Sequence, residues 1–132
     1  FYYIYQERFA GLEAVLLFLD DNHMKIYGPI LTSYYCDSLI ESAKTELNLP
    51  IEEINRCCKE YTSKFPEIAL EILDFIKSVC PILTEKYSSN PEYHSPNSLG
   101  DIIITIEREA GDIEDENSKK NILDRIKELD EE

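Results

Sequence analysis

The sequence predicts an all-α protein: a single helical bundle of five or six helices with a central apolar N-terminal helix. Three observations support this fold class. Apolar residues recur at intervals of three and four along most of the chain, which is the period of an amphipathic helix. Prolines, glycines and asparagines divide the chain into segments of helix length. Residues 102–106 have strand propensity, but no second segment offers a strand with which they could pair.

The length and composition predict one globular domain. The chain has 132 residues, of which 43% are hydrophobic and 30% charged, and this is a globular composition. We therefore expect residues 1–132 to fold as a single all-α domain with its own core. The chain begins with Phe1 and not with methionine, which is consistent with an excised domain, a processed form or a trimmed piece of a longer protein.

The first predicted helix covers residues 1–21. Its apolar residues at helical spacing are Phe9, Leu12, Leu16 and Leu19, and the stripe is widened by Val15, Leu17 and Phe18. A helix that is apolar nearly all round is usually the most buried one, so we expect this helix at the centre. The stretch DDNHMKIYGP, residues 20–29, contains stop signals and predicts the end of the helix.

Three further helices are predicted before the clearest loop. The second covers residues 30–47, and the third begins near Pro50, which suits a first helical turn. Pro66 opens the fourth, and Pro81 predicts a kink or break near Cys80. The predicted inner faces are Cys36, Ile40, Ala43 and Leu47 in the second helix; Ile51, Ile54, Cys57, Cys58 and Tyr61 in the third; and Ile68, Ile72, Phe75, Ile76, Val79, Leu83 and Tyr87 in the fourth.

The last third contains a loop at residues 87–98 and two more predicted helices, 98–110 and 112–131. The run IIITI favours a strand by propensity. A helix is favoured because Ser98 and Asp101 resemble a capping box and because Gly111 suits a helix end. Its inner face is predicted to hold Leu99, Ile102, Ile103 and Ile106.

The net charge of −14 restricts the partners. Such a field repels phosphate groups, so we expect no direct nucleic-acid binding and no anionic membrane binding. A basic partner protein fits better. Acidity is densest at the C-terminal end, where residues 101–132 hold 12 acidic and five basic residues. The alternative is that the acidity only keeps the domain soluble.

The four cysteines and the hydropathy indicate the compartment. Cys36, Cys57, Cys58 and Cys80 fall within helical patterns, so we expect buried free thiols in a reducing environment. The longest apolar run, residues 14–19, is far shorter than the ~20 residues of a spanning helix. We expect an intracellular location, cytoplasmic or nuclear, without a membrane segment.

Motifs for catalysis, metals and cofactors are weak. His23 and His94 stand alone, the cysteines lack zinc spacing, and residues 112–123 lack the glycine and glutamate of a calcium loop. We therefore expect no enzyme, no metal and no cofactor. One alternative remains, a carboxylate-dependent metal hydrolase. Two carboxylate pairs at a spacing of three resemble those of MazG-type nucleotide pyrophosphohydrolases: Glu71 with Asp74, and Glu109 with Asp112.

A binding surface is predicted around the loop and the acidic turn. Tyrosine is favoured at protein interfaces, and the predicted partner-binding residues are Tyr87, Tyr93, Asp112, Glu114, Asp115 and Glu116. The alternative is that most of the tyrosines are half-buried at the edge of the core. The predicted function is a protein–protein interaction module whose acidic surface binds a basic partner protein.

Two local resemblances accompany this prediction. Residues 87–111, YSSNPEYHSPNSLGDIIITIEREAG, resemble the tyrosine-bearing loop, Ser-Pro turn and following helix of colicin nuclease immunity proteins. This resemblance covers about 25 of 132 residues and lacks the paired tyrosines of that family. It implies the alternative of an immunity-like or antitoxin-like inhibitor of a basic enzyme. Residues 65–83, FPEIALEILDFIKSVCPIL, resemble a helix of helical-repeat proteins, although the sequence shows no internal repeat.

Overall fold

The computed structural model of the protein describes residues 11–45, 49–93 and 95–130. These residues form helices and connecting segments, without a strand, which confirms the predicted all-α class. The described helices are α2 (Leu12–Leu16), α3 (Asp21–Ala43), α4 (Ile51–Tyr61), α5 (Pro66–Ser89), α6 (Ser98–Ala110) and α7 (Glu116–Asp130).

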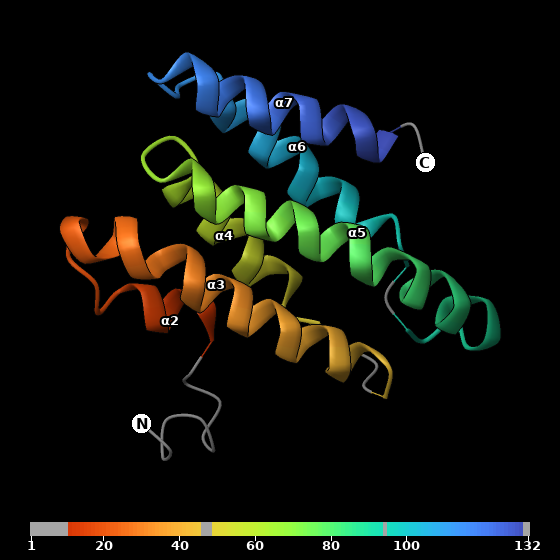
Figure 1. The fold of residues 1–132 in the computed structure, drawn as a ribbon. Coiled ribbons are helices and arrows are strands. Elements are labelled where there is room, and N and C mark those ends of the chain that lie inside the picture. Colours follow the sequence, from red (N-terminus) through yellow and green to blue (C-terminus); the bar gives the residue numbers. More distant parts are fainter. Residues whose placement is uncertain (1–10, 46–48, 94, 131–132) are drawn as a thin grey trace.

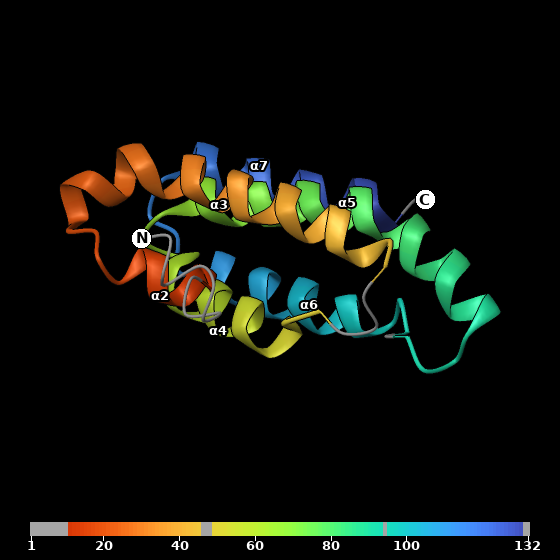
Figure 2. The ribbon, with the colours of Figure 1, turned by 90° about the horizontal axis from the view of Figure 1, so that it is seen from below.

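The described helices form three consecutive hairpins stacked in sequence order. Helices α3, α5 and α7 lie side by side in one layer, and α2, α4 and α6 form a second layer (Figure 2). Within each layer a helix contacts the next one along, and each hairpin joins the two layers. This is the arrangement of an α-solenoid, in which a hairpin buries its apolar face against its neighbours.

Helix α5 lies at the centre of the described part. It contacts α3, α4, α6 and α7, whereas α2 contacts only α3 and α4. The predicted central N-terminal helix is not confirmed, and residues 1–10 of that prediction lie outside the described residues. Leu12 and Leu16 of α2 are buried, but Leu17 and Phe18 are exposed, by 69% and 79%.

The predicted inner face of α5 is largely confirmed. Of the residues named from the sequence, only Tyr87 is exposed, and the buried ones are Ile68, Ile72, Phe75, Ile76, Val79 and Leu83. The helix continues across Pro81, so no break occurs, and its later part bends away from the axis of its first part, as the alternative of a kink predicts (Figures 1 and 2). Val79 and Leu83 keep both sides of Pro81 in the core, and burial of these side chains offsets the lost backbone hydrogen bond.

The start of α3 corrects the sequence prediction. Residues 20–29 were expected to be a loop, but the helix begins at Asp21. The Asp20 carboxylate accepts a hydrogen bond of 2.8 Å from the backbone N–H of His23, so Asp20 is the N-cap. The same carboxylate is 2.7 Å from the His23 ring, and these bonds lower its pKa. Acidic residues that suggested the end of one helix therefore begin the next.

Gly28 and Pro29 lie inside α3, although they were interpreted as helix breakers. A Cβ on Gly28 would lie 3.0 Å from Cδ1 of Ile68, so this glycine permits a close approach of α3 and α5. The Thr32 hydroxyl donates a 2.7 Å hydrogen bond to the Gly28 carbonyl. Packing against α5 thus maintains a helix that local propensity disfavours.

The C-terminal hairpin largely follows the sequence prediction. Helix α6 covers residues 98–110, and its buried residues include Leu99, Ile102 and Ile106. The predicted capping box is wrong, since Asn97 is the N-cap and makes no side-chain bond there. Gly111 ends the helix as expected, with right-handed backbone angles. Helix α7 begins at Glu116, four residues later than expected.

Candidate binding surface between α3 and α5

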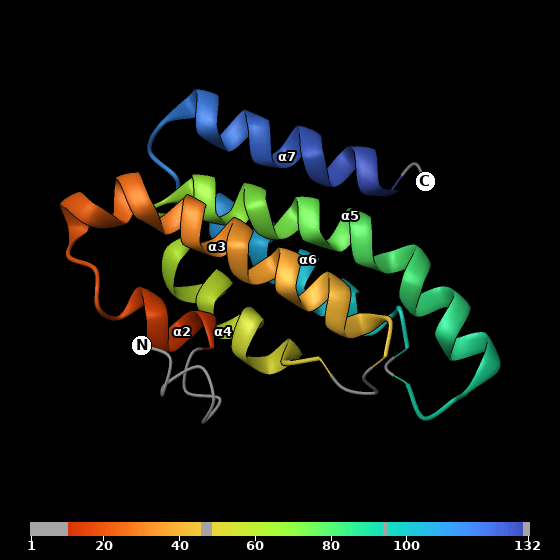
Figure 3. The ribbon, with the colours of Figure 1, turned by 60° about the horizontal axis from the view of Figure 1, so that its bottom comes forward.

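Helices α3 and α5 run in the same direction (Figures 1 and 3), and each carries a row of exposed or partly exposed residues. Residues separated by four, three and four positions share one side of a helix. On α3 these positions are Ile26, Ile30, Ser33 and Asp37, and on α5 they are Glu67, Glu71, Asp74 and Ser78.

A groove of about 190 Å³ lies between the two helices. Its lining combines four residues of each helix: Ser33, Cys36, Asp37 and Ile40 of α3, and Glu71, Asp74, Phe75 and Ser78 of α5. We call this feature the α3–α5 groove. Three carboxylates, those of Asp37, Glu71 and Asp74, line it, so the groove favours a positively charged group.

The electrostatics of the groove centre on Glu71. Partial burial raises the pKa of this carboxyl first, and the neighbouring Asp74 and Asp37 charges raise it further. The Ser33 hydroxyl and the Arg125 guanidinium act in the opposite direction. Arg125 of α7 pairs with Asp74. Among the described residues, neither Asp37 nor Glu71 forms an ion pair with a basic side chain.

An apolar strip adjoins the groove along α3. We call it the α3 ridge, and it consists of Ile26, Tyr27, Ile30 and Tyr34, which are 61%, 47%, 55% and 78% exposed. Leu17 and Phe18 lie in the connection from α2 to α3 and are exposed as well. Clusters of exposed apolar side chains on soluble domains typically mark interaction surfaces.

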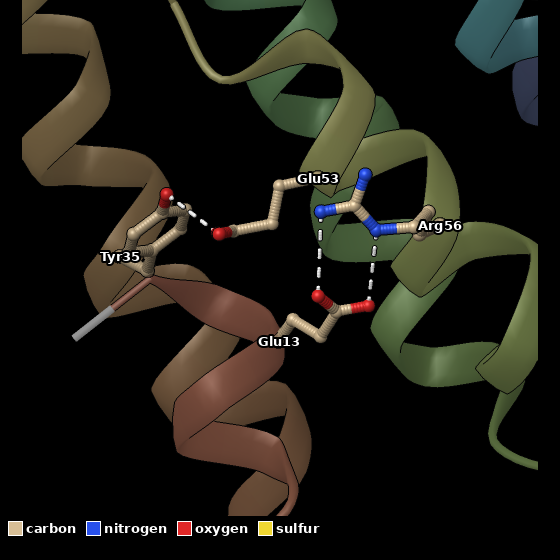
Figure 4. Close-up of polar contacts among 4 residues, drawn as sticks. All are labelled: Glu13, Tyr35, Glu53 and Arg56. Atoms are coloured by element: carbon tan, nitrogen blue, oxygen red, sulfur yellow. Dashed lines mark hydrogen bonds and ion pairs between the residues drawn. The ribbon is translucent and has the colours of Figure 1, made fainter. Parts of the chain in front are cut away.

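On the opposite side of α3, polar contacts join α3 to α4 and α4 to α2 (Figure 4). The Tyr35 hydroxyl donates a 3.1 Å hydrogen bond to Oε1 of Glu53. Burial, and then the Glu53 charge, raise the pKa of Tyr35, so the phenol stays protonated. Arg56 donates two hydrogen bonds to Glu13, of 3.2 and 3.4 Å. The Tyr35 hydrogen bond helps to fix the rotation of α3 and thereby the direction in which the ridge faces.

The residues predicted to bind a partner occupy two separate regions. Tyr87 is at the end of α5 and 40% exposed, and Tyr93 is half-buried in the following loop. Asp112, Glu114, Asp115 and Glu116 lie beyond the other end of α6. This helix has 13 residues, which separates its ends by about 20 Å. The structure therefore does not bring the tyrosines and these acids together.

Asp115 has a structural role at the start of α7. Its carboxylate accepts hydrogen bonds of 3.0 Å from the backbone N–H of Ser118 and 2.7 Å from the Ser118 hydroxyl. These bonds lower the pKa of Asp115. The contacts are those of a helix N-cap, while Asp112, Glu114 and Glu116 are exposed around it.

The α3 ridge was missed because residues 20–29 were assigned to a loop. The helical spacing of Ile26 and Ile30 with Asp37 was the available signal. Glu71 and Asp74 were recognised as a pair, but for metal chemistry. Their place opposite Asp37 depends on the packing of two helices, and sequence spacing alone does not indicate this.

The described cysteines are free thiols. Burial is the first cause that raises the pKa of Cys36 and of Cys57, each to about 12, and it raises that of Cys58 as well. These three thiols stay protonated at neutral pH, which disfavours nucleophilic chemistry. His94, considered as a base for Cys58, lies outside the described residues.

The described residues contain neither a cluster arranged to hold a metal ion nor a helix able to span a membrane. No group of three or more histidine, cysteine, aspartate or glutamate residues in 11–45, 49–93 and 95–130 is arranged to hold a metal ion. Glu71 and Asp74 line the groove toward α3, whereas Glu109 lies on α6 in the other layer. None of the described helices has the length and apolar character required to cross a membrane.

Comparison of the chain with family models, curated proteins and solved structures finds no match.

Proposed function

We propose that this protein is an interaction module that binds a basic segment of a partner protein at the α3–α5 groove. The observation that carries the proposal is the set of three groove carboxylates, Asp37, Glu71 and Asp74, of which only Asp74 has a basic partner among the described residues. A lysine or arginine of a partner would supply the missing positive charge. The net charge of −14 would also steer a basic protein toward the domain.

The raised pKa of Glu71 is consistent with a site that is completed by a cation. Its charged form is disfavoured by partial burial and by Asp74 and Asp37. A guanidinium or ammonium group beside Glu71 would favour the charged form, as a neighbouring opposite charge does in general. Binding should therefore lower the pKa of Glu71 and weaken at acidic pH, where the carboxylates are neutral.

An inhibitor of a basic enzyme is a special case of this proposal. It rests on the resemblance of residues 87–111 to immunity proteins, and that resemblance implies contacts at Tyr87 and Tyr93. These tyrosines lie at the far end of α5 from its first turn, so an inhibitor of that kind would use a different region from the groove.

Paired charge variants test the proposal. Asp37→Asn/Glu71→Gln removes two groove charges, and Glu60→Gln/Glu107→Gln removes two exposed charges from α4 and α6 in the other layer. Immobilised proteins would be exposed to source extract at low and high salt, and the captured basic proteins identified and quantified. We expect the groove variant to lose salt-sensitive capture that the control keeps. Equal loss in both variants, or capture that salt does not affect, would contradict the proposal.

A further inference from the structure

Helix α3 has an outward face that no described helix covers. Its inner residues pack against α2 and α5, while Ile26, Ile30 and Tyr34 are each more than half exposed. A single exposed isoleucine is common on protein surfaces and needs no explanation. A strip of exposed apolar residues at helical spacing indicates a surface that contacts another molecule.

The ridge and the groove form one continuous surface. Ile26 and Ile30 precede Ser33 and Asp37 on the same side of α3, and these last two line the groove. Gly28 touches Ile68 across the helix pair, and the helices are parallel. The first turns of α5, which contain Glu67 and Glu71, therefore lie alongside the ridge.

Charge decides what can cover this surface. A second copy of the chain would bring another net charge of −14 to the acidic groove, and anionic lipid would be repelled in the same way. A basic segment would be attracted by the groove carboxylates, whereas a second copy or anionic lipid would be repelled by them. An apolar side is also required, because Ile26 and Ile30 would otherwise stay in water.

We infer that the occupant is a basic amphipathic helix lying along α3 and α5, with its apolar residues on the α3 ridge and its lysine or arginine side chains at the groove carboxylates. This inference rests on the proposed function and specifies its partner. A helix fits because the neighbours in this layer, α3, α5 and α7, are themselves helices that lie side by side (Figure 3). Residues 26–37 extend for about 17 Å, or three turns of such a partner.

Peptide binding to matched variants tests the inference. The probe is a synthetic, fluorescently labelled peptide of leucine and lysine at amphipathic helical spacing, and the control peptide has the same composition in a shuffled order. Ile30→Asp alters the ridge, and Ile104→Asp is its control, because Ile30 and Ile104 are 55% and 54% exposed and Ile104 lies on α6 in the other layer. Circular dichroism and thermal melting would establish that both variants stay folded.

The sign of the effect separates apolar contact from charge. Ile30→Asp adds a negative charge beside an acidic groove, so electrostatics alone predicts tighter binding of the basic peptide. The inference predicts weaker binding, by about tenfold or more, because one buried apolar contact is lost. Ile104→Asp should change the affinity by less than about twofold.

The other outcomes identify which claim fails. Unchanged or tighter binding by Ile30→Asp, with weaker binding by Asp37→Asn/Glu71→Gln, overturns the inference and leaves the proposed function intact. Equal affinity for the shuffled peptide also overturns the inference. If neither variant weakens binding, both claims fail. If only Ile30→Asp weakens it, the charged part of both claims is wrong.

Discussion

Helices α3 and α7 occupy equivalent positions at the two ends of one helical layer, yet their free faces differ. On α3 the free face holds the apolar α3 ridge, whereas α7 presents Lys120, Asp124 and Glu128 with side chains 74%, 57% and 65% exposed. Exposed apolar strips typically mark interaction surfaces, and exposed charged residues do not. This difference is the reason for placing the proposed partner surface on α3.

The inner sides of the two ends are equally buried. Leu16 and Ile122 are both 0% exposed, so the contrast between the ends is confined to the outer face. We expect Leu16→Ala and Ile122→Ala each to lower the free energy of unfolding by about 2–5 kcal/mol, measured by urea denaturation. A loss below about 0.5 kcal/mol for Leu16→Ala would show that α2 is no part of the core. It would contradict the statement that the inner sides of the two ends are equally buried.

The hydrogen bond from Tyr35 to Glu53 tests how strongly α3 is held to α4. Tyr35→Phe removes the 3.1 Å hydrogen bond that joins α3 to α4. We expect a loss of about 1 kcal/mol in the free energy of unfolding, because the Glu53 carboxylate loses a partly buried donor. Tyr87→Phe, at an exposed position on α5, is the control and should have no measurable effect. Equal effects in the two variants would contradict this role of Tyr35.

Ion pairs at the two ends should contribute little and similarly. Arg56 pairs with Glu13 near the α3 end, and Arg125 pairs with Asp74 near the α7 end. Exposed pairs of this kind contribute little to stability, and salt screens them. We expect Arg56→Gln and Arg125→Gln to show small losses in thermal stability that shrink at high salt. A large loss in thermal stability that does not shrink at high salt, in either variant, would mean that the pair acts as a buried one.

The smallest expected effect is the pH dependence of thermal stability that Glu71 causes. Its folded-state pKa lies above the ordinary value of 4.5. Protonated Glu71 contributes stability. This contribution is complete below the ordinary pKa value and is lost as the pH rises through the folded-state pKa. Glu71→Gln should therefore melt above the wild type at about pH 7, and this difference should vanish below about pH 4. A Glu71→Gln variant that melts lower than the wild type at neutral pH would contradict this assignment.

Much of the fold could be predicted because the apolar stripes of α4, α5 and α6 correspond to their buried faces. The start of α3 could not, since Asp20 acts as an N-cap and Gly28 contacts Ile68, far away in the sequence. A stop signal and a start signal share the same residue types at the sequence level. Only the contact with Ile68 shows that Gly28 permits close packing of two helices and does not end α3.

The candidate surface was predictable only in its chemistry. An acidic surface for a basic partner followed from composition, but the α3–α5 groove required knowledge of which helices are neighbours. The predicted residues Tyr87 and Tyr93 and the acidic turn at 112–116 lie in two other regions, and their part in binding stays a prediction. The two regions and the groove consist of different residues, so a residue-by-residue measurement of binding can distinguish them.

The most direct measurement is a titration of ¹⁵N-labelled protein with the leucine–lysine peptide, followed by the shifts of backbone amide signals. The peptide should shift the amides of residues 26–37 and 67–78 most, with little change at 112–116. Largest shifts at 87–93 or 112–116, or shifts spread evenly over the acidic surface, would contradict binding at the α3 ridge and the α3–α5 groove.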